Sequence, residues 1–330
     1  MKKIRYGIIG FGSFAERAIL PAIRASKNSE IAALQKRSLS EAKRKAEEFS
    51  VPLYFDTPEK LVQHAEIDAV FIASANSQHY SETLAAAEAG KHVLVEKPMA
   101  MNAVEAKGMI ETCKTAKVKL MTGHMLRFSP LLLRMKELAA AGEIGDIISA
   151  RAEFYYDARN SKRQWLRDMS VAGGGPLFDI GIHCLDSLRF VLDDTVKKVK
   201  SISRPKPTKQ NIELSNMTLL EFRKGTIGTI YTSFETSLRQ TFIELAGTNG
   251  SLSAYNFTPS KIKTSLQIKH GDGLHSFQEQ FEEFEIPDLY ELEITHFSDC
   301  ILFGKEPMIT GESSLHNQII LDEALKDSQR

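Results

Sequence analysis

Hydrophobic residues in the first third of the chain form short continuous runs, and stretches with helical spacing separate these runs. Continuous apolar runs are typical of strands buried on both faces, as in a parallel sheet that crossover helices cover on both sides. The alternation of such strands with helices predicts an α/β fold with a doubly wound parallel sheet. The expected strands are residues 4–9, 30–35, 68–73, 92–96 and 118–122.

Signals for helix starts and stops fall between these strands. Thr57-Pro58 is typical of an N-cap followed by the first helical residue, because proline lacks an N–H that the helix start would leave unpaired. Asn102 and Glu105 have the spacing of a capping box. Helices are also expected at residues 40–49 and from about residue 78 to a stop at Gly90.

The pattern changes near Asp146, where apolar and polar residues begin to alternate. A period of two is typical of strands with one buried face, and Lys224-Gly225 between two such runs predicts a hairpin turn. We therefore expect a first domain of residues 1–123 and a second of residues 124–330, with a mostly antiparallel sheet. Its expected strands are 147–156, 196–203, 214–223, 226–234, 241–246, 252–257 and 262–268, and its closing helices are 289–303 and 314–325.

A glycine-rich segment, Gly10-Phe11-Gly12-Ser13-Phe14-Ala15, follows the first strand and opens a helical pattern. Gly10 suits a tight turn, Gly12 lets the backbone approach a pyrophosphate, and Ala15 is small enough for close packing of helix on strand. The N–H groups and the dipole of the helix start favour the phosphate charge. Because the motif lies between a strand and a helix, it predicts that all six residues bind a dinucleotide.

The end of the second strand carries Lys36, Arg37 and Ser38, with no acidic residue among them. A carboxylate at this place would hold the ribose 2′-hydroxyl of NAD, whereas basic residues accommodate the 2′-phosphate of NADP. Arg37 can bind that phosphate in a bidentate manner, and Lys36 adds positive charge. NADP is therefore the expected cofactor, with NAD and a merely solvated basic turn as the alternatives.

The stretch from Gly173 to Asp186 combines a glycine run with a helical pattern that begins at Pro176. Counted as a regular helix, it places Asp179, His183 and Asp186 on one stripe. A carboxylate one turn before an imidazole can fix the tautomer of the ring and raise its basicity, which suits acid–base chemistry. The alternative is a helix with a hydrogen-bonded, partly buried histidine.

Lys97 lies just past the strand at residues 92–96, within Glu96-Lys97-Pro98. Ligands of open α/β sheets bind at the carboxyl ends of the strands, where this lysine is expected. Pro98 disfavours helix at Lys97, so the amine can point into such a site. The alternative is a surface lysine in a salt bridge.

The composition excludes several other classes of protein. The 330 residues include 42 basic and 42 acidic side chains, so nothing global indicates a nucleic acid or a membrane surface as partner. Three widely spaced cysteines indicate neither a disulfide framework nor a structural metal site, and no metal is expected. The first apolar run is too short for a signal peptide, and no run is long enough to span a membrane. A cytoplasmic protein is expected.

The glycine motif, Glu96-Lys97-Pro98 and the run at residues 173–186 together closely resemble the Gfo/Idh/MocA oxidoreductase family, which includes glucose–fructose oxidoreductase and inositol dehydrogenase. The resemblance covers nearly the whole chain and extends to residues 76–79, 123–130, 245–250 and 290–296. It implies an N-terminal Rossmann domain and a C-terminal α/β domain whose large, open sheet forms the interface of a homodimer or homotetramer. The closing C-terminal helix can then pack back on the first domain.

The resemblance also implies roles for single residues. It assigns catalysis to Lys97, Asp179 and His183. It indicates that the loop at residues 159–172 lines the substrate pocket. The further cofactor contacts that it implies are Ser74, Asn76, His79, Glu96 and Lys97, and the substrate contacts are Arg127, Trp165, Arg167, Asp179 and His183.

The resulting hypothesis is an enzyme that transfers hydride between a nicotinamide and a carbinol or keto carbon of a sugar, cyclitol or related polyol. His183 is the expected acid–base group, and Lys97 stabilises charge on the reacting oxygen. Three alternatives stay open: a glycosidase that uses tightly bound NAD for transient oxidation, a cofactor- or sugar-sensing regulator without catalysis, and a reductase of non-sugar substrates such as dihydrodiols or biliverdin. The intact Lys97, Asp179 and His183 disfavour the regulator, which needs no acid–base group.

Overall fold

The computed structural model describes residues 2–159, 161, 163–271 and 276–330 and contains two compact units. The first unit consists of Met1–Met125 and Tyr290–Gln318, and the second of Leu126–Leu289 and Ile319–Arg330. The polypeptide therefore leaves the first unit, builds the second, and returns to the first with helix α9 (Leu289–Leu302). The division falls inside the last helix, α10 (Gly311–Ser328).

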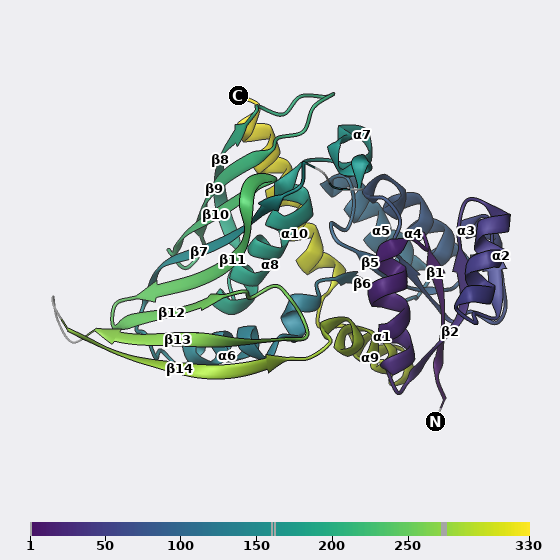
Figure 1. Cartoon of the computed structure of the whole chain (residues 1–330), viewed down its shortest axis with the longest axis horizontal. Coiled ribbons are helices and arrows are strands. Elements are labelled where there is room, and N and C mark those ends of the chain that lie inside the picture. Colours follow the sequence, from purple (N-terminus) through teal and green to yellow (C-terminus); the bar gives the residue numbers. More distant parts are fainter. Residues whose placement is uncertain (1, 160, 162, 272–275) are drawn as a thin grey trace. The chain divides into compact units, whose positions relative to one another are not determined.

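The first unit contains a six-stranded parallel sheet with the strand order β3-β2-β1-β4-β5-β6 (Figure 1). Every pairing in it is parallel, which confirms the predicted doubly wound sheet. Its strands are β1 (Ile4–Ile9), β2 (Ser29–Gln35), β3 (Leu53–Phe55), β4 (Ala69–Ile72), β5 (His92–Glu96) and β6 (Leu120–Gly123).

The helices between these strands begin where the sequence predicts. The Thr57 hydroxyl accepts a hydrogen bond from the Lys60 N–H, and the Asn102 side chain accepts from Val104 and Glu105. The helices are α1 (Leu20–Ala25), which continues a π-helical turn η1 (Ala15–Ile19), α2 (Leu39–Glu48), α3 (Pro58–Val62), α4 (His79–Glu88) and α5 (Ala103–Thr115), and a short 3₁₀ turn η2 (Asn76–Gln78) precedes α4.

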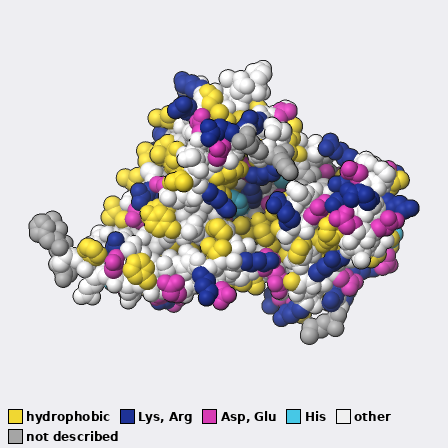
Figure 2. Space-filling view, viewed as in Figure 1, with side chains coloured by type: hydrophobic (Ala, Val, Ile, Leu, Met, Phe, Trp, Pro, Cys, Tyr) yellow, Lys and Arg dark blue, Asp and Glu magenta, His cyan; other side chains and the backbone are white. Residues whose placement is uncertain are grey.

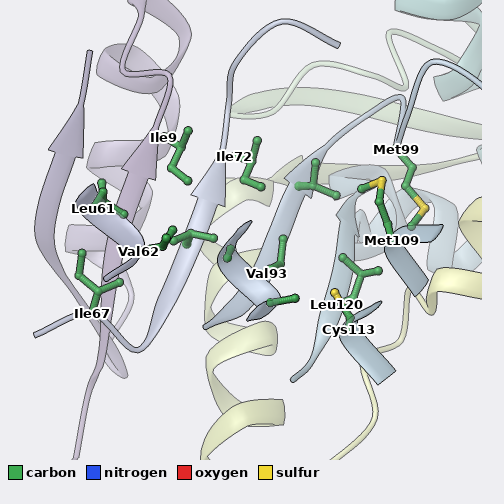
Figure 3. Packing of buried hydrophobic residues seen from close by; sticks show 14 of the residues in the cluster. Ile9, Leu61, Val62, Ile67, Ile72, Val93, Met99, Met109, Cys113 and Leu120 are labelled. Carbon is green, nitrogen blue, oxygen red and sulfur yellow. The ribbon is translucent and has the colours of Figure 1, made fainter. Parts of the chain in front are cut away.

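One hydrophobic cluster packs strands of the parallel sheet against the helices that cover them (Figure 3). Ile9, Ile72 and Val93 come from adjacent strands, and Met109 and Cys113 come from α5. All these side chains are almost completely buried. Burial of this kind explains why the strands appear in the sequence as continuous apolar runs rather than as alternating ones.

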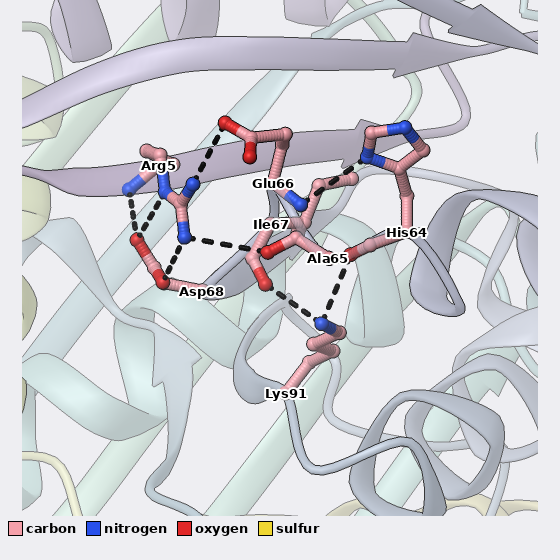
Figure 4. A network of polar contacts seen from close by, with 7 residues as sticks. All are labelled: Arg5, His64, Ala65, Glu66, Ile67, Asp68 and Lys91. Carbon is pink, nitrogen blue, oxygen red and sulfur yellow. Dashed lines mark hydrogen bonds and ion pairs between the residues drawn. The ribbon is translucent and has the colours of Figure 1, made fainter.

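A polar network joins the amino-terminal ends of β1 and β4 (Figure 4). The Arg5 guanidinium donates from Nε and Nη2 to the two carboxylate oxygens of Asp68, over 3.0 and 2.9 Å, and from Nη1 to Glu66 over 2.8 Å. Lys91 donates to the carbonyls of His64 and Ile67. These contacts lie at the opposite ends of the strands from the glycine motif, so they serve stability rather than ligand binding.

The second unit contains an eight-stranded sheet with the order β14-β13-β12-β11-β7-β10-β9-β8. All its pairings are antiparallel except β7 with β10, which confirms the predicted mostly antiparallel sheet. Its strands are β7 (Ile147–Asp157), β8 (Val196–Arg204), β9 (Ser215–Phe222), β10 (Ile227–Ser233), β11 (Glu235–Gly247), β12 (Gly250–Tyr255), β13 (Ile262–Gly271) and β14 (Phe277–Ile286). The predicted hairpin turn joins β9 to β10, with Gly225 at φ +99°.

Three features of this unit differ from the expectation. Strand β14 is not expected because its residues are mainly Glu, Gln and Phe without a clean period of two. Helix α6 (Pro130–Ala140) is also not expected, and β11 is longer than the predicted 241–246. Strand β14 pairs in a hairpin with the preceding β13. Strand β11 pairs with β7, and α6 packs on β14, so these two elements depend on partners far away in the sequence, which a local pattern does not contain.

Helix α8 (Ile182–Leu192) forms the centre of the second unit, and every one of its residues is buried. It packs against β7, β10 and α6. The opposite face of the sheet carries exposed apolar side chains in register across neighbouring strands. One row joins Ile202, Met217 and Tyr231, and Met217 and Ile202 are 49% and 78% exposed. We call this surface the open face.

Candidate active site

Two glycines of the first loop have different reasons to be glycine. Gly10 has φ +76°, and a Cβ atom there would lie 2.6 Å from the backbone nitrogen of Ser74, so the chain itself requires glycine. A Cβ at Gly12 would meet nothing in the described chain closer than 3.9 Å. Gly12 therefore leaves open space above the backbone, which fits the approach of a dinucleotide pyrophosphate.

The rest of the glycine loop is held against the end of β2. Gly10 N donates to the Gln35 side chain over 3.0 Å, and Phe11 N donates to the Gln35 carbonyl over 2.9 Å. The helical segment that follows begins at Ser13, whose first turn leaves backbone N–H groups without intrahelical partners. It was expected to be regular but contains the π-helical turn at Ala15–Ile19. The residues present thus fit a bound dinucleotide phosphate.

The residues of the basic segment after β2 have different surroundings: Lys36 and Ser38 make contacts within the protein, and Arg37 is exposed to solvent. The Lys36 amine donates to the Phe11 carbonyl over 3.2 Å and lies 3.6 Å from Glu41. Ser38 is the N-cap of α2. Arg37 is exposed and makes no hydrogen bond or ion pair with any described residue. Its guanidinium is therefore available to a ligand, while Lys36 is partly committed to the glycine loop.

His79 links the loop after β4 to the turn after β5. Its ring has no exposed surface, with Nδ1 3.0 Å from the Pro98 carbonyl and Nε2 3.3 Å from the Ser74 carbonyl. Burial lowers the pKa of His79 to about 4, against the opposing effect of these carbonyls, so the ring is neutral at physiological pH. His79 therefore connects the two loops, and the cofactor contact expected of it stays a prediction.

The Ser74 side chain is held by a hydrogen bond to Glu82 on α4. The Ser74 hydroxyl donates to the Glu82 carboxylate over 2.5 Å, and Glu82 is 8% exposed. Burial raises the pKa of Glu82 to about 7, although the serine hydrogen bond acts in the opposite direction. Sequence patterns do not predict this pairing, because Glu82 lies within the apolar pattern of α4. Asn76, also an expected cofactor contact, is 5% exposed in the 3₁₀ turn η2.

Lys97 follows the last residue of β5, at the carboxyl edge of the parallel sheet where the sequence predicts it. Its side chain is half-buried, the Lys97-Pro98 peptide bond is cis, and the Lys97 N–H donates to the Glu96 carboxylate over 3.2 Å. Glu293 on α9 is completely buried and lies near Glu96. Burial, with the Glu96 charge adding to it, raises the pKa of Glu293 well above its usual range.

In the second unit, the helix that begins after Pro176 is not regular at its start. A π-helical turn, η5 (Leu177–Gly181), carries Asp179 and runs directly into α8, which carries His183. The sequence predicts regular α-helical spacing over this stretch, and that prediction is wrong for the first turn. A π turn is wider than an α turn, so Asp179 and His183 do not have the offset of an ordinary i, i+4 pair. Such turns occur frequently at functional sites.

Asp179 is 6% exposed and has two donors that the sequence analysis did not identify. Arg163 Nη2 lies 3.2 Å and the Tyr156 hydroxyl 3.4 Å from Asp179 Oδ2, and Arg163 also donates to the Tyr156 oxygen over 2.9 Å. Burial, together with the Asp179 charge, raises the pKa of Tyr156 to about 12, so the phenol keeps its proton. The arrangement fixes a charged carboxylate in the turn before His183.

His183 is 9% exposed, and its ring centroid lies 6.3 Å from that of Phe154 on β7. Asp186, expected on the same face of the helix as Asp179 and His183, pairs with Arg127. It forms a buried bidentate ion pair with Arg127, over 2.9 and 2.6 Å. Arg127 is 7% exposed. An arginine whose guanidinium is occupied in this way holds the helix in place, and the substrate contact expected of Arg127 stays a prediction.

The expected substrate loop is only partly described, since Asn160 and Lys162 lie outside the described residues. Trp165 is half-buried in the 3₁₀ turn η4 (Gln164–Arg167). Arg167 donates to the carbonyls of Ala158 and Arg159, which closes the loop on itself. The residue of this loop that reaches a predicted catalytic group is Arg163, not Trp165 or Arg167, as far as the described contacts extend.

Neither a metal site nor a membrane span is present in the described part of the chain. No group of three or more His, Cys, Asp or Glu side chains there could hold a metal ion, and the three cysteines are buried and free. Among the described helices, none combines the length and the apolar character that crossing a bilayer needs.

The fold and the glycine loop define an oxidoreductase that binds a nicotinamide dinucleotide. A family profile described as "Oxidoreductase family, NAD-binding Rossmann fold" matches residues 4–124, and a GFO/IDH/MocA C-terminal domain profile matches residues 132–253. The chain belongs to the Gfo/Idh/MocA oxidoreductase family.

Several relatives are similar over nearly the full length. The 1,5-anhydro-D-fructose reductase of Ensifer adhaerens is 31% identical and covers 94% of this chain and 92% of its own. The D-xylose 1-dehydrogenase (NADP(+)) 2 of Haloferax volcanii is 27% identical, with coverages of 98% and 97%. The crystal structure of aldose-aldose oxidoreductase from Caulobacter crescentus complexed with glycerol has a TM-score of 0.88 at 26% identity, with coverages of 99% and 98%.

The buried Glu82 predicts a pH-dependent stability. Its carboxyl binds its proton more tightly when folded, since burial raises the pKa from 4.5 to about 7. The free energy of unfolding should therefore fall as pH rises from about 4.5 to about 7. Glu82→Gln removes the charge, so the variant should be more stable than the parent at pH 8, by at most about 3 kcal/mol, and show little such gain at pH 4.5.

The measurement is urea or thermal unfolding of both proteins at the two pH values. Glu88→Gln is the matched control, because Glu88 lies on the same helix but is exposed. An advantage of Glu82→Gln that is equal at both pH values, or a loss at pH 8, would contradict the assignment.

Proposed function

We propose that this protein is an NADP-dependent dehydrogenase or reductase that acts on a carbinol or keto carbon of a sugar, cyclitol or related polyol. The observation that carries the proposal is the fixed Asp179 carboxylate on a π turn directly before His183, a histidine suited to proton transfer. A regulator that only binds a ligand has no need of such a group. The names of the relatives, which are reductases and dehydrogenases of anhydrofructose and xylose, support a sugar-like substrate.

In the proposed reaction, His183 exchanges the hydroxyl proton of the substrate, and Lys97 donates a hydrogen bond to the same oxygen as negative charge develops there. The nicotinamide, when bound, supplies or accepts the hydride. Asp179, on the turn directly before His183, contributes the carboxylate of the proposed site. Arg163 and Tyr156 keep that carboxylate in one orientation through their hydrogen bonds.

The dinucleotide would be held by the glycine loop at Gly10–Ala15, by Ser74 and by Asn76, with Glu96 and His79 supporting the loops. Preference for NADP over NAD is proposed from the segment after β2. Arg37 there is exposed and has no partner in the described chain, and the neighbouring α2 begins with the N-terminal N–H groups that favour a phosphate. An acid that would repel the 2′-phosphate is absent from residues 35–38.

Lys97→Met should lower kcat by about 10²- to 10³-fold, because it removes a donor that acts on the oxygen in the transition state. NADP affinity should change by less than about threefold, since the lysine does not act on the phosphates. His183→Asn should lower kcat by a similar factor. A panel of polyols and keto-sugars, read by absorbance of the reduced nicotinamide, provides the substrate, and fluorescence titration provides the NADP affinity.

Lys60→Met, on an exposed lysine of α3, is the control for loss of a positive charge. Equal losses in kcat and in NADP affinity for Lys97→Met would count against the proposed role. Full activity of His183→Asn would exclude His183 as the acid–base group.

Arg37→Ala should lower kcat/KM for NADP by about 10- to 100-fold, the range expected for loss of a charge-assisted bidentate contact. The value for NAD should stay the same or rise, because NAD has no phosphate at this place. Arg44→Ala is a matched control, since Arg44 is exposed on α2 and its one partner among the described residues is Glu48. An equal fall in kcat/KM with both cofactors would show that Arg37 does not recognise the 2′-phosphate.

We also propose that the protein is a homodimer or homotetramer assembled through the open face. Its apolar side chains lie in register on adjacent strands, and hydrophobic side chains gather over β8–β14 in the space-filling view (Figure 2). Besides Ile202 and Met217, Leu219 and Tyr255 are 48% and 59% exposed. A contiguous apolar surface of this kind is typical of an interface between subunits.

Met217→Glu combined with Leu219→Glu should reduce the mass in solution to that of the monomer, because association would bury unpaired charges. Light scattering after size-exclusion chromatography measures the mass, and circular dichroism checks the fold. Val104→Glu is the control, as Val104 is 80% exposed on α5. A monomeric parent protein, or an unchanged mass in the double variant, would refute the interface.

A further inference from the structure

Glu213 is a completely buried carboxyl group that the sequence analysis did not single out. It lies in the segment just before β9, and its Oε1 accepts two backbone hydrogen bonds, from Gly175 N over 3.0 Å and from Leu177 N over 3.1 Å. Pro176, between them, has no N–H. Both available N–H groups at the start of the π turn are therefore bound by one side-chain oxygen.

The backbone of Glu213 is in equally close contact with the same segment. A Cβ atom at Gly175 would lie 2.0 Å from the Glu213 carbonyl oxygen, so only glycine fits there. The other two glycines also have internal reasons: a Cβ at Gly174 would lie 2.4 Å from the Phe178 ring, and Gly173 has φ +78° at the end of α7 (Met169–Ala172). The run of glycines is thus explained by packing within the second unit.

A short chain of hydrogen bonds joins Glu213 to the predicted catalytic residues. Glu213 holds the N–H of Gly175, and the carbonyl of Gly175 accepts from Asp179 N over 3.1 Å. The π turn continues without a break into α8, where His183 is the second residue. A shift of the turn at Gly175 would therefore displace both Asp179 and His183.

The second oxygen of Glu213 has no hydrogen-bond partner among the described residues. Burial raises the pKa of this carboxyl, while the two N–H groups act in the opposite direction. A buried carboxyl without a compensating cation is costly, and a substitution to an apolar residue would leave two buried N–H groups unpaired. Among the described residues, the Glu213 side chain therefore has hydrogen bonds only to the start of the π turn.

We propose that Glu213 is a positioning residue for the proposed reaction. The hydrogen bonds from Gly175 N and Leu177 N to its Oε1 hold the start of the π turn in place, and so fix the positions of Asp179 and His183. The proposal rests on the proposed function of those two residues. It requires an acceptor at the right distance and does not require a negative charge.

Two conservative variants distinguish the effect of the length of the Glu213 side chain from the effect of its charge. Glu213→Gln keeps an acceptor oxygen at the same distance but is neutral. Glu213→Asp keeps the carboxylate but is shorter by one methylene, so it cannot reach both N–H groups. Thr232→Val is the matched control, because Thr232 packs against Gly181 at the other end of the same turn and its buried hydroxyl has no described partner.

Glu213→Gln and Thr232→Val should keep kcat within about threefold of the parent, whereas Glu213→Asp should lose about 30- to 100-fold in kcat with NADP affinity unchanged, as expected for misplacement of catalytic groups by about 1 Å. Amide hydrogen exchange should distinguish Glu213→Asp from the other two variants independently of any activity measurement. The amides of Gly175, Leu177 and Asp179 should exchange at least tenfold faster in Glu213→Asp only.

Equal losses in Glu213→Gln and Glu213→Asp, or no loss in either, would overturn the proposal. Unchanged exchange at Gly175 and Leu177 in Glu213→Asp would overturn it as well. If His183→Asn is fully active, the proposed function fails instead, and the exchange rates still decide whether Glu213 anchors the turn.

Discussion

Parallel strands end at one edge of their sheet, and this constraint brings together the chemistry of the first unit. Strands β1, β4 and β5 are neighbours, so the segments that follow them, at Gly10, Ser74 and Lys97, lie side by side. Close contacts then join them. Gly10 has no room for a side chain because Ser74 is there, and His79 connects the carbonyls of Ser74 and Pro98. The dinucleotide loop and the lysine are thus parts of one hydrogen-bonded edge.

The second unit depends on a different constraint, the need to satisfy polar groups on a helix that is buried on all sides. Asp186 is satisfied by Arg127, Asp179 by Arg163 and Tyr156, and the N–H groups at the start of the π turn by Glu213. Each of these groups would destabilise the folded state if it were unpaired, because a buried polar group without a partner is costly. The polar partners are therefore as much a part of the fold as the leucines of α8.

The sequence alone predicted five of the six strands of the parallel sheet, the turn at Gly10 and the helix caps, because the signal for each lies within a few residues. Strand β3 (Leu53–Phe55) was not expected. Thr57 and Asn102 cap their helices as expected. The partners of the candidate site are different: Glu213 reaches Gly175 across 38 positions, and Arg127 reaches Asp186 across 59. No local pattern contains such a pairing. The π turn at Leu177–Gly181 was missed because apolar spacing does not distinguish it from an ordinary helical turn.

The complete burial of α8 has a consequence for how substrate preference can change in this protein. A helix whose every side chain is packed accepts few replacements, since even one added methylene is felt in a close-packed interior. Under the proposed function, changes of substrate preference would arise in the loop that contributes Arg163 to Asp179, where Arg163 is about half exposed and Trp165 half-buried.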